Sequence, residues 1–310
     1  MEIIETIDNP LVPYDLLFQA DEDDAKIAVY RNTAVFWAAR VDDDIVGILG
    51  LLELNSGEAE IVNVSVRETF RRRGLATRLI EAAIAYARET GYRDLFIRTG
   101  DCGIWQISLY QRCGFRMDSI RKDYFLREYK VPIYENNIRC VNQVTLKYRI
   151  YTEAELRQEL SGYWTRFIER HPQYAGRPHT VWHFGYGEYL PDKLLGLVKL
   201  GKKTATSSAL EMYTGEEEKV PEVGDLSIIT YGNGLPGCII ETREIRKKKF
   251  REITGEDAAL EGEGDLSLAY WRQAHEWFFR LEYRDNRREF SEEIPVIFER
   301  FAVVYDEDRK

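Results

Sequence analysis

The chain has 310 residues, enough for two domains of ordinary size, and 44% of them are hydrophobic. This hydrophobic fraction excludes an intrinsically disordered chain, because burial of apolar side chains can offset the entropy lost on folding. The 53 acidic residues outnumber the 43 basic ones, and the net charge of −10 excludes the global positive field of a duplex-DNA-binding protein. A local RNA or nucleotide site, which needs only a few cations, is compatible with this charge.

The sequence contains no feature that would place the protein in a membrane. No stretch reaches the roughly 18 consecutive apolar residues that span a bilayer, and the acidic start MEIIETIDNP lacks the features of a signal peptide. We therefore expect a soluble, cytoplasmic protein with no membrane partner. The four cysteines, at 102, 113, 140 and 238, form no CxxC pair, so we expect free thiols in a reducing compartment. His179 and His183 are accompanied by neither an HExxH motif nor a cysteine cluster, so we expect no metal.

The first half of the chain reads as strands followed by alternating helices and strands. Leu75, Leu79, Ala83 and Ala87 recur every four residues and predict one apolar helix face, with Gly91 as the C-terminal cap. The strands are predicted from β-branched and apolar runs bounded by turn residues. The expected elements are strands at 34–41, 45–54, 60–66, 94–99 and 115–119, and helices at 75–89 and 104–112. Their order predicts an α/β or α+β domain with a mixed sheet.

The pattern changes near residue 150. Thr152 and Glu155 have the T-x-x-E spacing of a capping box, which predicts the start of a helix. The expected elements beyond it are helices at 153–170, 191–200 and 269–283, and strands at 226–231, 238–245 and 296–304. We therefore expect two domains, residues 1–150 and residues 151–310, of which the second is mostly β with peripheral helices.

The first chemical pattern lies where the strand at 60–66 leads through a loop into the helix at 75. Gly74 and Ala76 are small, so backbone amides there can approach a ligand closely. The helix dipole and the unpaired N–H groups of the first turn favour an anion, and three arginines at 71–73 strengthen that preference. The pattern predicts a phosphate or pyrophosphate site. The structural alternative is a glycine-containing loop with a solvated basic face.

The residues around this loop give the first half a family resemblance. Two valines at 64 and 66 precede the loop, and Tyr110 is followed four residues later by Gly114-Phe115. Residues 1–150 thereby resemble the GNAT superfamily of acyl-CoA N-acyltransferases. The resemblance implies a mixed, mostly antiparallel sheet with helices on both faces, and acetyl-CoA as co-substrate. It also implies that the strand at 60–66 splays from the next one, so that the gap takes the pantetheine arm. The residues implied to bind acetyl-CoA are Val64 and Val66 through their backbone groups, and Arg71, Arg72, Arg73, Gly74, Leu75, Ala76 and Thr77 at the pyrophosphate.

Two residues carry the expected chemistry of amine acylation. The amine must lose a proton before it attacks, and Glu60 on the preceding strand matches the glutamate that several GNAT enzymes use as general base. The alternative is an ordinary carboxylate at a strand edge. Tyr110 matches the tyrosine that protonates the leaving thiolate, and its alternative is a buried structural tyrosine. The run 134–137, Tyr-Glu-Asn-Asn, is predicted to be a turn rather than a reader of the acceptor.

The second pattern is the run Gly201-Lys202-Lys203-Thr204-Ala205-Thr206. A lysine beside hydroxyls can bind phosphate, or can activate a hydroxyl if it is desolvated and neutral, whereas a strand start is the structural alternative. Together with Trp182-His183-Phe184-Gly185 and the acidic motif at 261–268, this run makes residues 152–305 resemble the ASCH domain, a PUA-related β-barrel. The resemblance implies binding of RNA or a nucleotide. In one branch it implies hydrolysis of acetylated cytidine by a lysine, a threonine and a glutamate, here Lys203, Thr206 and Glu263.

The leading hypothesis is an acetyl-CoA-dependent N-acetyltransferase with a small-molecule or nucleoside amine as acceptor, fused to an ASCH module that binds RNA or a nucleotide. Attack by a primary amine would be direct, within a ternary complex. One alternative is an amidohydrolase centred on Lys203 and Thr206 that acts on an acetylated nucleoside. Another is a non-catalytic RNA-binding protein whose first half senses acyl-CoA. The basic run 246–251 would then contact single-stranded RNA, unless it is a solvated strand edge. The oligomeric state is open.

Overall fold

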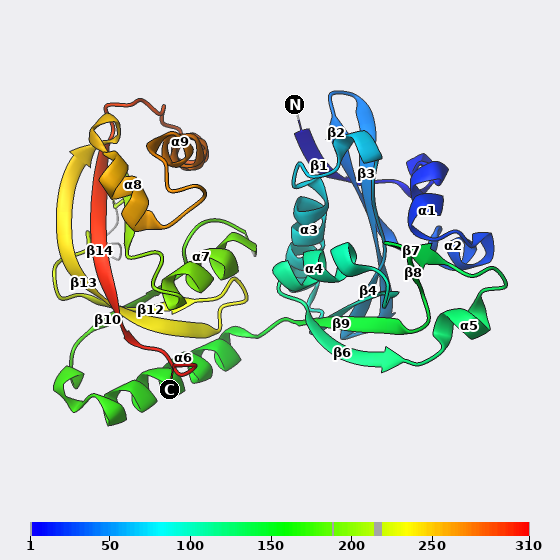
Figure 1. Ribbon diagram of the computed structural model, residues 1–310, viewed down its shortest axis with the longest axis horizontal. Coiled ribbons are helices and arrows are strands. Elements are labelled where there is room, and N and C mark those ends of the chain that lie inside the picture. The colour runs from blue at the N-terminus through cyan, green and yellow to red at the C-terminus, as the bar shows by residue number, and fades with distance from the viewer. Residues whose placement is uncertain (1, 188, 214–218, 310) are drawn as a thin grey trace. The chain divides into compact units, whose positions relative to one another are not determined.

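The computed structural model describes residues 2–187, 189–213 and 219–309 (Figure 1). The chain divides into two compact units, Met1–Tyr151 and Thr152–Lys310. Within the described ranges, no helix is long and apolar enough to cross a membrane. Short 3-10 helices punctuate both units, at Asn9–Leu11, Glu68–Phe70, Pro172–Tyr174, Leu210–Met212 and Phe250–Glu252.

Unit 1 is built on a seven-stranded sheet with the order β1-β2-β3-β4-β5-β9-β6. Its strands are β1 (Glu2–Ile7), β2 (Val35–Val41), β3 (Asp44–Asn55), β4 (Glu58–Val66), β5 (Asp94–Gly100), β6 (Arg116–Arg121) and β9 (Gln143–Arg149). Every neighbouring pair is antiparallel except β4 and β5, which run parallel. The expected mixed, mostly antiparallel sheet is therefore confirmed.

Helices cover both faces of this sheet, as expected (Figure 1). They are α1 (Tyr14–Ala20), α2 (Asp24–Tyr30), α3 (Leu75–Thr90), α4 (Ile104–Arg112) and α5 (Tyr124–Glu128). Alternate residues of β2 point to opposite faces of the sheet. Trp37 packs into the cluster that holds the apolar face of α3, whereas Phe36 packs into the cluster that holds Leu16 and Ile27 from α1 and α2.

The predicted helix over 75–89 is confirmed, and Gly91 caps it in the left-handed conformation at φ 87°. The turn predicted around Asn136 and Asn137 is also confirmed: both residues have positive φ and join β7 (Tyr134–Glu135) to β8 (Ile138–Arg139). The elements before residue 34 were not predicted. α1 and α2 are seven residues each, too short to show a clear helical period.

Unit 2 contains a five-stranded sheet with the order β10-β12-β13-β14-β11. Its strands are β10 (His179–Trp182), β11 (Ala205–Ala209), β12 (Leu226–Thr230), β13 (Pro236–Lys249) and β14 (Pro295–Tyr305), and its helices are α6 (Glu153–Arg170), α7 (Tyr189–Lys199), α8 (Gly255–Glu261) and α9 (Leu268–Asp285). The predicted capping box is confirmed, because the Thr152 side chain accepts from the Glu155 N–H and the Glu155 carboxylate accepts from the Thr152 N–H.

The expected β-barrel is not closed within the described ranges, since the hydrogen-bonded ladder ends at β10 on one side and at β11 on the other. These edge strands are only four and five residues long. The long strand β13 lies in the middle of the sheet, between β12 and β14. Its pairing with β14 has two register shifts, after Ile239 and after Thr242. Such irregularities bend a strand and increase its twist, so the sheet curls without closing.

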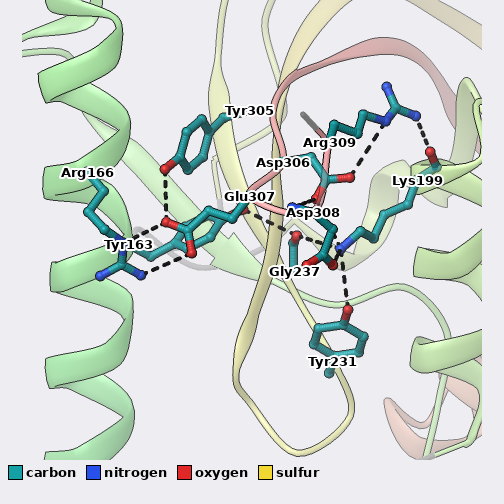
Figure 2. Close-up of polar contacts among 10 residues, drawn as sticks. All are labelled: Tyr163, Arg166, Lys199, Tyr231, Gly237, Tyr305, Asp306, Glu307, Asp308 and Arg309. Atoms are coloured by element: carbon teal, nitrogen blue, oxygen red, sulfur yellow. Dashed lines mark hydrogen bonds and ion pairs between the residues drawn. The ribbon is translucent and has the colours of Figure 1, made fainter.

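Ion pairs fix the C-terminal end of β14 to two helices (Figure 2). The Lys199 ammonium of α7 lies 3.1 Å from the buried Asp306 carboxylate and also contacts Asp308. Arg166 of α6 lies 2.5 Å from Glu307, which accepts a hydrogen bond from Tyr305. Burial alone would lower the pKa of Lys199, but the two carboxylates outweigh it and raise the pKa. Lys199 is therefore charged under all ordinary conditions.

Replacement of Lys199 should destabilise unit 2. In Lys199→Met the Asp306 carboxylate, 2% exposed, keeps the Asp308 backbone N–H as a donor at 3.1 Å, but its nearest cation is the more distant Arg309 at 3.6 Å. Leaving a buried carboxylate poorly paired costs about 2 to 3 kcal/mol, measured as the free energy of unfolding in urea. Lys193→Met, at an exposed position of the same helix, is the matched control and should stay within about 0.5 kcal/mol of the wild type. Equal stability of both variants would contradict this account.

Candidate functional site

The most distinctive feature of unit 1 is the point where β4 and β5 part. Their parallel pairing runs only from Glu58–Asp94 to Ile61–Ile97. β4 nevertheless continues to Val66, still paired on its other side with β3. Beyond Ile61, one edge of β4 therefore has no neighbouring strand among the described residues. Val64 lies in this open part of β4 and is partly exposed.

The loop after β4 ends in a cradle of backbone amides. Arg72 and Gly74 both have positive φ, 63° and 79°. The first hydrogen bond of α3 runs from the Arg78 N–H to the Gly74 carbonyl, and no side chain caps the helix. The amides of Leu75, Ala76 and Thr77 thus have no intrahelical acceptor. A Cβ atom added to Gly74 would meet nothing within 4 Å, so the approach to these amides is open. This geometry suits an anion.

Two of the three arginines of the loop, Arg71 and Arg73, contact neighbouring groups. The Arg71 Nε donates to the Val66 carbonyl at 3.1 Å, which ties the loop to the end of β4. The same carbonyl accepts from the Gln19 side chain at 3.1 Å, so both of its lone pairs are used. The Arg73 guanidinium lies 4.9 Å from the centre of the Phe70 ring. Of the expected pantetheine contacts, the Val66 carbonyl would accept from a ligand only after losing one of these partners.

Glu60 lies on the paired part of β4, beside the parting point. Its carboxylate forms an ion pair with the Arg98 guanidinium of β5, and the two side chains are 15% and 29% exposed. The contact is made through the Glu60 Oε2. As a general base, Glu60 would therefore use its other carboxylate oxygen or exchange Arg98 for the proton.

Tyr110 projects from α4 into the same core cluster as α3 and is 6% exposed. Burial raises the pKa of Tyr110 above the usual value of 10, and the nearby Glu135 and Cys113 raise it further. None of the described residues forms a hydrogen bond with its hydroxyl. Tyr110 thus stays protonated at neutral pH and holds a proton that it can donate.

The expectation of four free thiols is wrong for two of them. Cys102 and Cys140 form a disulfide, whereas Cys113 and Cys238 are free and buried. β5 and β9 pair antiparallel with Gly100 opposite Gln143, so the residues just beyond these strand ends meet. The two cysteines are 38 residues apart and form no CxxC motif, so the sequence alone did not predict that they pair. Glu135 lies 3.9 Å from the Cys102 sulfur, but two bonded sulfurs leave no thiolate for a metal.

The second cluster is centred on a glutamate that sequence reasoning missed. Glu261, at the end of α8, is 0% exposed and accepts from Ser207 Oγ at 2.6 Å and Trp271 Nε1 at 2.7 Å. Lys203 Nζ lies 3.0 Å from Glu261 and 2.8 Å from Glu263. His275 Nε2 lies 3.3 Å from Glu261 Oε2, the oxygen that Lys203 also contacts. The signal that could have identified Glu261 was its position two residues before Glu263, in the same acidic motif.

Charge pairing decides the state of Lys203. Burial lowers its pKa, but Glu261 and Glu263 outweigh that effect and raise it. Burial likewise raises the pKa of Glu261, and Lys203 and His275 outweigh it and hold the pKa far below its usual value. Lys203 is therefore an ion-paired cation, not the neutral amine that activates a hydroxyl. This cluster links β11, α8 and α9 through a fully hydrogen-bonded carboxylate.

The structure separates Thr206 from this cluster. Ser207 and its neighbours at 205 and 209 point into the core, so Thr206 points to the other face of β11. In the sheet Thr206 lies opposite Glu299. Of the three expected residues, Lys203 and Glu263 are thus in contact, and neither forms a hydrogen bond with Thr206 within the described ranges.

Four of the five basic side chains in the run 246–251 form ion pairs with acidic side chains, and the fifth, Lys247, is exposed. Arg246 and Lys248 lie 2.9 and 2.5 Å from the two oxygens of Asp257. Lys249 and Arg251 lie 2.9 and 2.7 Å from Glu293. Cations held in this way release little free energy on binding phosphate, so the geometry favours the strand-edge alternative over RNA contact.

Comparison with known proteins identifies both units. Residues 4–115 match the model of the acetyltransferase (GNAT) family, and residues 180–305 match that of the ASCH domain. The uncharacterized N-acetyltransferase YvbK of Bacillus subtilis (strain 168) is 38% identical over 133 residues, which are 43% of this chain and 86% of YvbK. The chain belongs to the GNAT family of acetyltransferases. Its first unit is an acyltransferase that uses acetyl-CoA as co-substrate, and its second unit carries an ASCH domain.

Other similar proteins cover one unit each. Human N-acetyltransferase 8 is 27% identical over 99 residues, 30% of this chain and 44% of that protein. A Bacillus subtilis acetyltransferase solved in complex with CoA is 34% identical and covers 49% of this chain and all of its own, with a TM-score of 0.46. An ASCH domain from Lactobacillus crispatus JV V101 is 30% identical and covers 48% of this chain and 95% of its own, with a TM-score of 0.45.

Proposed function

We propose that residues 1–150 transfer an acetyl group from acetyl-CoA to a primary amine, by direct attack within a ternary complex. One observation carries the proposal: the open edge of β4 beyond Ile61 leads directly to the uncapped amides of Leu75, Ala76 and Thr77. An extended thiol arm fits the first feature, and a pyrophosphate fits the second. The two features are adjacent along the chain, as the two parts of coenzyme A are adjacent along the cofactor.

The chemistry follows from the groups beside the parting point. The neutral amine attacks the thioester carbonyl carbon, the new C–N bond forms, and the C–S bond breaks. Tyr110 gives its proton to the leaving thiolate. Burial raises the pKa of Tyr110, so the hydroxyl keeps this proton until the thiolate forms. The proton of the amine passes to Glu60, directly or through water, at the oxygen that Arg98 does not contact.

We propose that residues 151–310 form a module that binds RNA or a nucleotide. We also propose that the acceptor of the first unit is a small-molecule amine or a nucleoside. The charged state of Lys203 supports binding over hydrolysis of an acetylated nucleoside, because an ion-paired lysine cannot serve as a base. A cytoplasmic location is part of this proposal. One observation stands against it: the disulfide between Cys102 and Cys140 belongs to a class of bond that is rare in reducing compartments.

Gly74→Glu should weaken acetyl-CoA binding at least about tenfold in calorimetry, because a carboxylate beside the amides repels a pyrophosphate. Gly91→Glu is the matched control. Gly91 lies at the other end of the same helix, has a similar φ of 87°, and also has open space around its Cβ position. Both variants carry the same backbone strain and charge, so only a binding role of the Gly74 site separates them. Equal affinities would remove the pyrophosphate site from this loop.

Tyr110→Phe should lower turnover by about a hundredfold, because the thiolate then leaves without a proton donor. Affinity for acetyl-CoA should hardly change, since the ring and its packing remain. Tyr86→Phe, in a tyrosine packed against the same core, is the control and should keep wild-type turnover. The measurement is release of the CoA thiol under saturating acetyl-CoA. Wild-type turnover of Tyr110→Phe would make this residue structural.

The binding role of the second unit predicts that the full chain retains single-stranded RNA on a filter, with an affinity that falls steeply as salt rises. Incubation with acetylated cytidine should release no acetate. Acetate release by the wild type that disappears in Lys203→Ala would replace the binding role by an amidohydrolase.

A further inference from the structure

A cluster of aromatic side chains surrounds a lysine ammonium on the α1–α2 side of unit 1. Lys26 Nζ lies 3.5 Å from the centre of the Tyr129 ring and 5.2 Å from that of Tyr124. It also lies 3.4 Å from the Tyr124 hydroxyl. Phe125 packs between the two tyrosines, with ring centres 5.2 Å and 5.3 Å away. We call these four residues, together with Asp21, the aromatic ammonium site. Cation and ring faces at such distances attract one another.

This site is attached to both of the strands that part. Tyr30, whose hydroxyl accepts from Asn63 Nδ2 at 3.0 Å, joins it to β4 two residues beyond the last pair with β5. Tyr30 also interacts electrostatically with Asp21 and Tyr129. On the other strand, Phe125 lies 3.4 Å from the Cβ position of Gly100, the last residue of β5. The aromatic ammonium site therefore borders the gap where the thioester is proposed to lie.

One oxygen of the Asp21 carboxylate is left without a donor. Its Oδ1 is buried and has no hydrogen-bond partner among the described residues, although the carboxyl group as a whole also interacts with the Tyr129 hydroxyl and the Asp23 backbone N–H. Burial raises the pKa of Asp21, while the Lys26 ammonium acts to lower it. A buried carboxylate oxygen without a donor is rare in folded proteins, and it favours a ligand that brings N–H groups. An alkylammonium ion brings three of them.

The site stabilises the charged form of an amine. Burial lowers the pKa of Lys26, but the Tyr129 and Tyr124 side chains outweigh that effect and raise it. An amine held there remains an ammonium and has no lone pair for attack. The cation that this site takes from a substrate is therefore not the reacting amine, and the acceptor must carry a second amine.

We propose that the aromatic ammonium site binds the non-reacting ammonium of a diamine or polyamine acceptor, which takes the place of the Lys26 ammonium. The proposal rests on the proposed acetyl transfer and names its substrate class. The free amine of the acceptor attacks the thioester, a C–N bond forms and the C–S bond breaks. The nitrogen loses its proton to Glu60, and the thiolate takes the Tyr110 proton. The bound ammonium passes through the reaction unchanged. The net charge of −10 favours the approach of such a polycation.

The test compares three amines of equal chain length that differ at the far end: 1,4-diaminobutane, butylamine and 4-aminobutanoate. Their far ends are an ammonium, a methyl group and a carboxylate. Thiol release from acetyl-CoA by the full chain gives kcat/KM for each. Diaminobutane should exceed butylamine by about tenfold or more, which is the selectivity expected of one desolvated cation–π contact, and aminobutanoate should be the poorest.

Variants of the aromatic ammonium site test which residues cause the preference for diaminobutane over butylamine. In Lys26→Ala the built-in cation is gone, so the KM for diaminobutane should fall about threefold or more. In Tyr129→Leu the ratio of kcat/KM for diaminobutane to that for butylamine should fall towards one. Lys130→Ala and Tyr134→Leu are matched controls at exposed positions nearby, and should leave both the KM and the ratio at their wild-type values.

Each other outcome overturns the proposal in a recognisable way. Equal use of butylamine and diaminobutane would remove the ammonium site while leaving acetyl transfer intact. A preference for aminobutanoate would assign Lys26 to a carboxylate instead. If none of the three amines releases thiol although acetyl-CoA binds in calorimetry, the diamine class is wrong. If acetyl-CoA itself does not bind, the proposed function fails as well.

Discussion

The chemistry proposed for unit 1 depends on one irregularity of its sheet, the early end of the pairing between β4 and β5. These are the only parallel neighbours among the seven described strands, and they stay together for four residue pairs. β4 keeps its antiparallel partner β3 up to Val66, with a register shift where Gly50 lies opposite Asn63 and Leu51 opposite Ile61. Such an irregularity bends a strand, and it lies at the point where β5 departs. An open strand edge in the middle of a sheet has backbone groups that a ligand can satisfy. The proposed site is therefore created by the place where the pairing of β4 and β5 ends, rather than by any one side chain.

The groups around this gap are held by one local contact and one long-range contact. Arg71 ties the anion loop to the end of β4, and the disulfide from Cys102 ties the start of α4 to the segment before β9. α4 carries Tyr110, so the disulfide also holds the start of the helix that carries the proposed acid. On the opposite face of the sheet, Asn63 and Gly100 connect the same gap to the aromatic ammonium site. The two faces of one gap thus separate proton donation from recognition of the acceptor.

Unit 2 depends on a different principle, the complete satisfaction of a buried charge. Glu261 receives donors from four side chains, and Lys203 is shared between it and Glu263. Burying these charges is costly, and only the full set of partners makes it tolerable. The same network keeps Lys203 charged and ion-paired. This state favours a structural role for Lys203 and Glu261 over the reactive role that the sequence pattern suggested.

Local patterns in the sequence determined much of this protein. The four-residue spacing of leucine and alanine predicted α3, Gly91 its end, and Thr152 with Glu155 the start of α6, because these features depend on neighbours along the chain. The glycine at the uncapped start of α3 was predictable for the same reason, since Gly74 and the helix start are contiguous. Only the tertiary structure decided the pairing of Cys102 with Cys140, the role of Glu261, the opposite faces of Thr206 and Ser207, and the open ladder of unit 2. Each of these is set by contacts between residues far apart in sequence, and such contacts follow from the packing of whole elements, which no local pattern encodes.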